Sequence, residues 1–372
     1  MENLIAESDF FLLYNIAYGI LFLFAILTIL YLDIRNTNYK STKLSSTLSF
    51  VIILFFTIIV GLREYNVGTD TYNYHLFNWV YGYRSESHTE IIFDTLITIL
   101  KKFNLTFTAF LSIISVLFYY FVYRALKNFS AHLEINVLII AFIFFSLFFS
   151  KSLSINVIRQ GLSLALLLYA LSLWIMGKSK IMRIVFISLA VLTHMTSLIP
   201  ILLFVVISSI GKKFNLNVLI WIYIIVIAVS ALGVGVLTVA PFLESALSGD
   251  KYSAYLSSET EEYVVGFKLQ FVIFNSIFLY IFYRIYNSFT KTDFLKEKYK
   301  ILLYYYILSS ILFFLMFQIP YSDRFGLFSW IIIPILIGPI LKKENKILSI
   351  KTPVVIFFLV IYLFFIVYGN NK

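Results

Sequence analysis

Four side chains could carry chemistry because they place charge or basicity against apolar sequence. Three are arginines, Arg63, Arg159 and Arg324, at the ends of apolar runs or inside them. An arginine costs about 2.5–3.5 kcal/mol at the centre of a membrane helix, so it usually faces a bundle interior or a wet cavity. Its guanidinium stays protonated and binds phosphate oxygens through paired N–H donors. The three arginines therefore predict a site for a phosphorylated ligand.

A structural interpretation is open for each arginine, namely an ion pair with a carboxylate. Glu64 follows Arg63 and Asp323 precedes Arg324, whereas Arg159 has no acidic neighbour in the sequence. The functional interpretation is therefore best supported for Arg159.

The fourth side chain is His194, in the middle of the apolar run Ile184–Ile210 and close to two threonines and a serine. A lone histidine in an apolar run is more often a buried structural residue than a catalyst. Imidazole titrates near neutral pH, however, and can accept a proton from a hydroxyl there. The run predicts either one tilted span or a re-entrant hairpin of two short helices with His194 near its tip.

A polar segment that starts at Arg63 adds weaker candidates. Gly68 and Asp70 are ordinary turn residues, so a structural turn is the plain interpretation. Asp70 could instead orient an arginine or a sugar hydroxyl, and Gly68 could let the backbone approach a substrate. Tyr72 belongs to a group of aromatic residues that fits an interfacial belt, with stacking on sugar rings as the alternative. The chain has no cysteine and no Asp-x-Asp pattern, so neither a metal nor another cofactor is expected.

The elements that hold these residues are membrane helices. The chain has 372 residues, of which 61% are apolar and 13% charged, and its mean hydropathy is +0.93. Apolar runs of about 17–25 residues match the length of a helix that crosses a bilayer. This composition predicts an all-α, polytopic bundle, and the net charge of +10 records topology, with no nucleic-acid partner implied.

We expect a retained first helix and about ten full spans. The predicted helices lie near 10–32, 44–62, 105–123, 135–150, 157–176, 218–240, 268–289, 301–318, 325–341 and 352–368. A polar turn is expected at 151–156 and a surface helix at 91–103.

Loop charges set the orientation. Placing the N-terminus outside puts 19 of the 29 Lys and Arg residues, but only 5 of the 19 acids, on the cytoplasmic side. These signs agree to the end of the chain only if the run at 184–210 dips in and returns, which favours the re-entrant hairpin. We treat residues 1–372 as a single transmembrane domain with outer loops at 63–104 and 241–267.

Several motifs in order along the chain resemble one family. They are Arg63 with Gly68-Thr69-Asp70-Thr71-Tyr72, Arg159-Gln160, Leu192-Thr193-His194 and Arg324. Together they resemble the EpsG family of bacterial polysaccharide polymerases, the Wzy-like proteins of O-antigen, capsule and exopolysaccharide assembly.

The resemblance implies a fold related to the GT-C glycosyltransferases and a multi-pass protein of the bacterial cytoplasmic membrane. Such an enzyme joins oligosaccharide units carried on undecaprenyl pyrophosphate, with its active site facing the exterior. A chain-length regulator and a flippase of the same pathway are the expected partners. Our hypothesis assigns catalysis to His194, Arg159 and Arg324, and substrate binding to Arg63, Gly68, Asp70, Tyr72 and Gln160.

Two other classes stay open. A transporter or flippase of a lipid-linked glycan would also need arginines in a cavity, but would more often show internal repeats, and none is visible. A non-catalytic scaffold would not need arginines within the membrane.

Overall fold

A computed structural model describes residues 5–34, 41–82, 90–210, 214–239, 265–289, 294–341 and 362. Within these ranges the regular structure is helical, and the only β contact is an isolated bridge between Ile5 and Arg63. The all-α prediction is confirmed. The chain divides into two compact units, residues 1–198 with 338–372 and residues 199–337, and the single-domain expectation stays a prediction.

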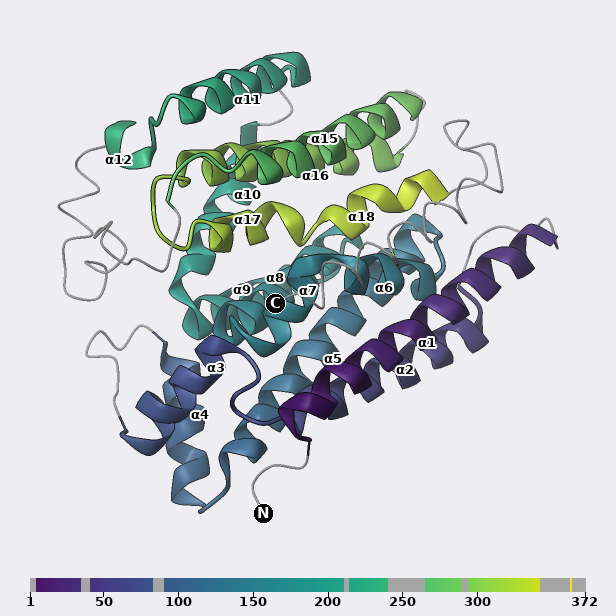
Figure 1. The fold of residues 1–372 in the computed structure, drawn as a ribbon. Helices are drawn as coiled ribbons and strands as arrows, with labels where there is room; N and C mark the ends of the chain where they lie inside the picture. Colours follow the sequence, from purple (N-terminus) through teal and green to yellow (C-terminus); the bar gives the residue numbers. More distant parts are fainter. Residues whose placement is uncertain are drawn as a thin grey trace. The chain divides into compact units, whose positions relative to one another are not determined.

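The first unit contains Arg63, Arg159 and His194 and the helices next to them in the sequence (Figure 1). Its α-helices are α1 (Glu7–Ile34), α2 (Lys43–Gly61), α3 (Thr69–Asn73), α4 (Ile91–Lys102), α5 (Phe107–Leu133), α6 (Val137–Ser146), α7 (Phe148–Ile155), α8 (Ile158–Ile175) and α9 (Lys180–Thr193). The π-helix η1 (Tyr74–Val80) continues directly from α3, and the 3₁₀ turns η2 (Met195–Ser197) and η3 (Gly338–Leu341) complete the unit.

Helix α5 is central to the packing of this unit. It packs against α2 on one side and α8 on another, and α8 packs in turn against α7 and α9. Helix α1 lies along α2 and α6, as Figure 1 shows. The short helix α4 packs against α5 and α9, so the segment after α2 is fixed to the helix that His194 follows.

The second unit is built around α16 (Phe294–Leu315). Helix α16 packs against α11 (Leu216–Ala231), α15 (Leu269–Ser288), α17 (Asp323–Trp330) and α18 (Ile333–Ile337). The remaining helices are α10 (Leu198–Ile210), almost all of which belongs to this unit, and the short α12 (Val236–Val239).

Seven helices of the described residues are long and apolar enough to cross a membrane, or eight if the bent pair α6 and α7 counts as one span. This composition makes the chain a multi-pass membrane protein. The expected number of about ten spans is not reached within the described residues. Residues 352–361 and 363–368 of the predicted last helix, and most of the predicted outer loop at 241–267, lie outside them.

Two local predictions were wrong. The helix expected at 135–150 bends by 80° at Leu147, which separates α6 from α7. The polar turn expected at 151–156 is largely helical, because α7 extends to Ile155. Three serines in this segment, Ser146, Ser150 and Ser154, donate their hydroxyls to nearby backbone carbonyls, which explains how a polar segment stays helical.

The predicted break at His194 is present. Helix α9 ends at Thr193, His194 has extended backbone angles (φ −156°, ψ 114°), and η2 follows before α10 begins. A helix is also present where one was expected at 91–103, as α4, and its position along the membrane surface stays a prediction.

Candidate active site

A buried carboxylate joins Arg159 to His194. Glu90 is only 5% exposed; its Oε2 accepts a hydrogen bond from Arg159 Nη1, and its Oε1 lies 3.0 Å from His194 Nδ1. The three residues are far apart in the sequence, so only the packing of α4, α8 and α9 brings them together. The expected convergence of Arg159 and His194 is present in the first unit, but it depends on an acid that the sequence did not single out.

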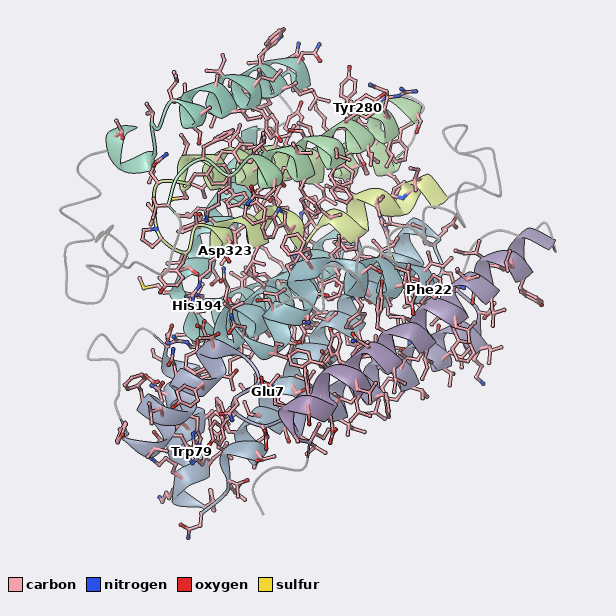
Figure 2. All side chains as sticks on the ribbon, in the orientation of Figure 1. Glu7, Phe22, Trp79, His194, Tyr280 and Asp323 are labelled. Atoms are coloured by element: carbon pink, nitrogen blue, oxygen red, sulfur yellow. The ribbon has the colours of Figure 1, made fainter. Side chains whose placement is uncertain are left out.

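Each of the three side chains projects from the end of a helix. Glu90 immediately precedes α4, Arg159 is in the first turn of α8, and His194 immediately follows α9. His194, labelled in Figure 2, lies at the end of α9 in the unit that also contains α4. A helix end leaves backbone groups without partners inside the helix, so such a position suits a polar site within an apolar bundle.

Two aromatic rings surround the Arg159 guanidinium. Its carbon lies 4.5 Å from the centre of the Tyr74 ring and 5.8 Å from that of Phe93, and its Nε donates to the Tyr74 hydroxyl at 3.0 Å. Stacking of this kind contributes about 0.5–2 kcal/mol and fixes the plane of the guanidinium. The Arg159 side chain nevertheless remains 26% exposed, so part of it is accessible to a ligand.

The start of α8 favours an anion at this place. The first N–H groups of a helix carry a partial positive charge, and an arginine in the first turn adds a full one. Without a counter-charge, a cation at a helix N-terminus is mildly unfavourable. Glu90 supplies that counter-charge, which allows Arg159 to occupy the first turn of α8.

Arg63 holds the loop that follows α2. Its side chain is fully buried, and its guanidinium donates to the carbonyl oxygens of Val60, Val67 and Ile155 and to the Thr71 hydroxyl. Burial lowers the pKa of Arg63 to about 9, which leaves the group protonated at neutral pH. These contacts give Arg63 a structural role, and substrate binding by Arg63 stays a prediction.

Gly68 brings the same loop against the end of α7. Its φ is +99°, and a Cβ at this position would lie 2.2 Å from the Ile155 carbonyl oxygen. The absence of a side chain at Gly68 therefore allows this close approach to the Ile155 carbonyl, and a substrate contact at Gly68 stays a prediction. The Asp70 backbone N–H donates to the Asn156 side chain at 2.9 Å, which fixes the start of α3 to the turn before α8.

The other predicted substrate residues differ in exposure. Gln160 is 5% exposed on α8, next to Arg159, and Tyr72 is 43% exposed on α3. The Tyr65 ring lies 6.1 Å from Tyr72 and stacks on His75 at 4.0 Å, which forms an aromatic surface beside α3. Tyr72 and Asp70 stay candidates for sugar contacts.

Arg324 belongs to the second unit. It lies in the first turn of α17, with its guanidinium 4.8 Å from the centre of the Tyr321 ring. Because each unit is described by itself, the grouping of Arg324 with Arg159 and His194 stays a prediction.

Sequence reasoning missed Glu90 and the contact that Tyr74 makes. Glu90 is one of several acids in its loop, and only its place immediately before an amphipathic helix distinguishes it. Tyr74 belongs to the same aromatic group as Tyr72, for which an interfacial belt was the plain interpretation. The described residues contain no group of three or more His, Asp or Glu side chains that could hold a metal ion.

Comparison with known proteins decides the family. The EpsG family model matches residues 46–372, which is most of the chain and includes the Glu90, Arg159 and His194 cluster. The chain belongs to the EpsG family. No curated protein and no solved structure matches it. The EpsG family comprises Wzy-like polysaccharide polymerases, which agrees with the resemblance stated above.

Proposed function

We propose that this chain is a glycosyltransferase that joins oligosaccharide repeat units carried on undecaprenyl pyrophosphate, at the outer face of the bacterial cytoplasmic membrane. The observation that carries the proposal is the meeting of Arg159 and His194 on Glu90. The cluster combines a partly exposed cation with an imidazole at one helix-terminal site, as transfer from a lipid diphosphate requires.

At the anomeric carbon the reaction makes one bond and breaks one, and the attacking hydroxyl gives up its proton to a base. A hydroxyl of the incoming repeat unit attacks the anomeric carbon of the sugar attached to the lipid diphosphate. The bond from that carbon to the phosphate oxygen breaks, and the diphosphate leaves with the electron pair. It leaves as a stable anion, so no general acid is needed for departure.

Arg159 would bind the diphosphate and stabilise the charge that develops on it. A preorganised donor of this kind is worth about 10²–10³ in rate. His194 would accept the proton of the attacking hydroxyl, which contributes about 10²–10⁴. Arg324 would add a second cation to the diphosphate, while Asp70, Tyr72 and Gln160 would contact the glycan.

The test is polymerisation by the purified protein in lipid nanodiscs, with the lipid-linked repeat unit from a strain that lacks the polymerase. We expect Arg159→Gln and His194→Gln each to lower the rate of polymer formation at least 100-fold. The matched control is Arg124→Gln, an exposed arginine of the same unit that stacks on Tyr120 and Tyr169 and should keep full activity.

The alternative is a flippase of the same lipid-linked glycan. A flippase would move the repeat unit across the bilayer of a proteoliposome and would form no polymer. Normal-length polymer from both Arg159→Gln and His194→Gln would refute the catalytic assignment.

A further inference from the structure

The Glu90 side chain does not make the contacts that its place before a helix would predict. It is the residue immediately before α4, where a carboxylate commonly accepts hydrogen bonds from the first N–H groups of the helix. The Glu90 side chain makes no such capping bond, and both of its oxygens are turned toward other helices. The side chain is therefore used for contacts with Arg159 and His194.

The chemistry of the two contacts fixes the proton on His194. Arg159 contacts Oε2, and a neighbouring guanidinium favours the ionised form of a carboxyl group. An ionised carboxylate can only accept hydrogen bonds, so at 3.0 Å the His194 Nδ1 must be the donor. In the neutral imidazole the proton then resides on Nδ1, and Nε2 is the basic nitrogen.

We propose that Glu90 is a positioning residue that holds His194 in the tautomer with a basic Nε2 and at the same time fixes Arg159 beside it. This inference rests on the proposed function, in which His194 accepts the proton of the attacking hydroxyl. That proton moves to Nε2, and the imidazolium that forms is stabilised by the Glu90 carboxylate. One rigid carboxylate thus sets the spacing between the base and the cation that binds the diphosphate.

The first test compares Glu90→Gln with Glu90→Asp in the full-length protein. Gln keeps the size of the side chain, but its amide can donate to Nδ1, which places the imidazole proton on Nε2. Loss of the correct tautomer in a comparable catalytic arrangement costs about 10⁴ in kcat. We expect Glu90→Gln to lower kcat at least 100-fold with KM changed less than threefold, and Glu90→Asp to restore part of the rate.

The control is Asp94→Asn, which removes one negative charge one helical turn further along α4. It should leave both kcat and KM unchanged. A general loss of negative charge or of folding would lower activity in both Glu90→Gln and Asp94→Asn, or would change KM together with kcat, and either result would overturn the proposal.

The second test needs no substrate. ¹⁵N NMR of histidine-labelled protein distinguishes the two neutral tautomers, and the His194 signals are those lost in His194→Gln. We expect protonated Nδ1 in the wild type and protonated Nε2 in Glu90→Gln, and the same tautomer in both would overturn the proposal. If His194→Gln polymerises normally while the tautomer still changes, the base assignment fails and the Glu90 contact stands.

Discussion

The contact of Gly68 with the end of α7 gives a prediction whose size can be worked out. Gly68→Ala adds a methyl group at a position with φ +99°, 2.2 Å from the Ile155 carbonyl oxygen. Gly177, between α8 and α9, also has positive φ (+65°), but no described atom lies within 4 Å of its Cβ position. The change in Tm of Gly177→Ala therefore measures only the strain of placing alanine at a positive φ.

The cost of each change follows from its contacts. A left-handed conformation costs alanine about 1–2 kcal/mol, part of which is offset because alanine also restricts the unfolded chain. At Gly68 the loop must also withdraw until the contact lengthens from 2.2 Å to at least 3.4 Å. That movement weakens the hydrogen bonds that Arg63 and Thr71 donate to the same carbonyl. Losing these two hydrogen bonds adds about 2–4 kcal/mol to the destabilisation, because hydrogen bonds from charged donors contribute more than those from neutral donors.

The measurement is thermal unfolding of the detergent-solubilised protein. We expect the apparent Tm of Gly68→Ala to lie about 4–8 °C below that of Gly177→Ala, on a scale of about 2 °C per kcal/mol for a large chain. Proteolysis after Arg63 should become faster in Gly68→Ala only, because the loop loses its attachment to α7. Equal Tm values for the two variants would refute the argument that Gly68 is required for close approach.

Three further predictions concern the same unit. Arg63→Met leaves buried carbonyl groups without a donor, so it should destabilise the protein by about 3–5 kcal/mol, measured as a lower apparent Tm, and unchanged Tm would contradict the structural role. Gly161→Ala would place a Cβ 2.0 Å from the Leu153 carbonyl oxygen, so it should reduce the amount of folded protein recovered from membranes, measured by fluorescence-detected gel filtration. Tyr74→Phe removes the acceptor of the Arg159 Nε–H but keeps the ring, so polymer formation should fall only about 3–10-fold, and a loss as large as that of Arg159→Gln would refute this division of roles.

Much of the fold follows from apolar length alone. A run of about 20 apolar residues has few alternatives to a helix in a bilayer, because every backbone group must be bonded within the segment. The helices at 43–61, 158–175 and 269–288 agree closely with the prediction for this reason. The break at His194 was also predictable, since one helix over Ile184–Ile210 would be about 40 Å long.

The bend at Leu147 was not predictable by that argument. Residues 135–150 have the length and apolarity of one straight span, and the sequence contains neither proline nor glycine there. The bend accompanies a tertiary contact, in which the last carbonyl of α7 accepts hydrogen bonds from Arg63 and Thr71. Arg63 and Ile155 are 92 positions apart, so their contact produces no periodic pattern in the sequence of either segment.

The candidate site was predicted in part. Charge and basicity in apolar sequence indicated Arg159 and His194, because a desolvated ionisable group needs a reason to be there. The same reasoning did not predict the structural contacts of Arg63, whose buried guanidinium bonds three backbone carbonyls and the Thr71 hydroxyl. It overlooked Glu90, because a carboxylate in a polar loop carries no visible cost until packing buries it.

The attachment of Arg63 to Ile155 has a consequence for biogenesis. Helix α2 and Arg63 emerge from the ribosome long before α7 is synthesised, so the nascent loop first has only its local acceptors, Val60, Val67 and Thr71. Its final conformation must wait until α7 has been inserted and the Ile155 carbonyl is delivered. The loop after α2 is thus completed late in translation, and nascent chains arrested before residue 155 should expose it to added protease.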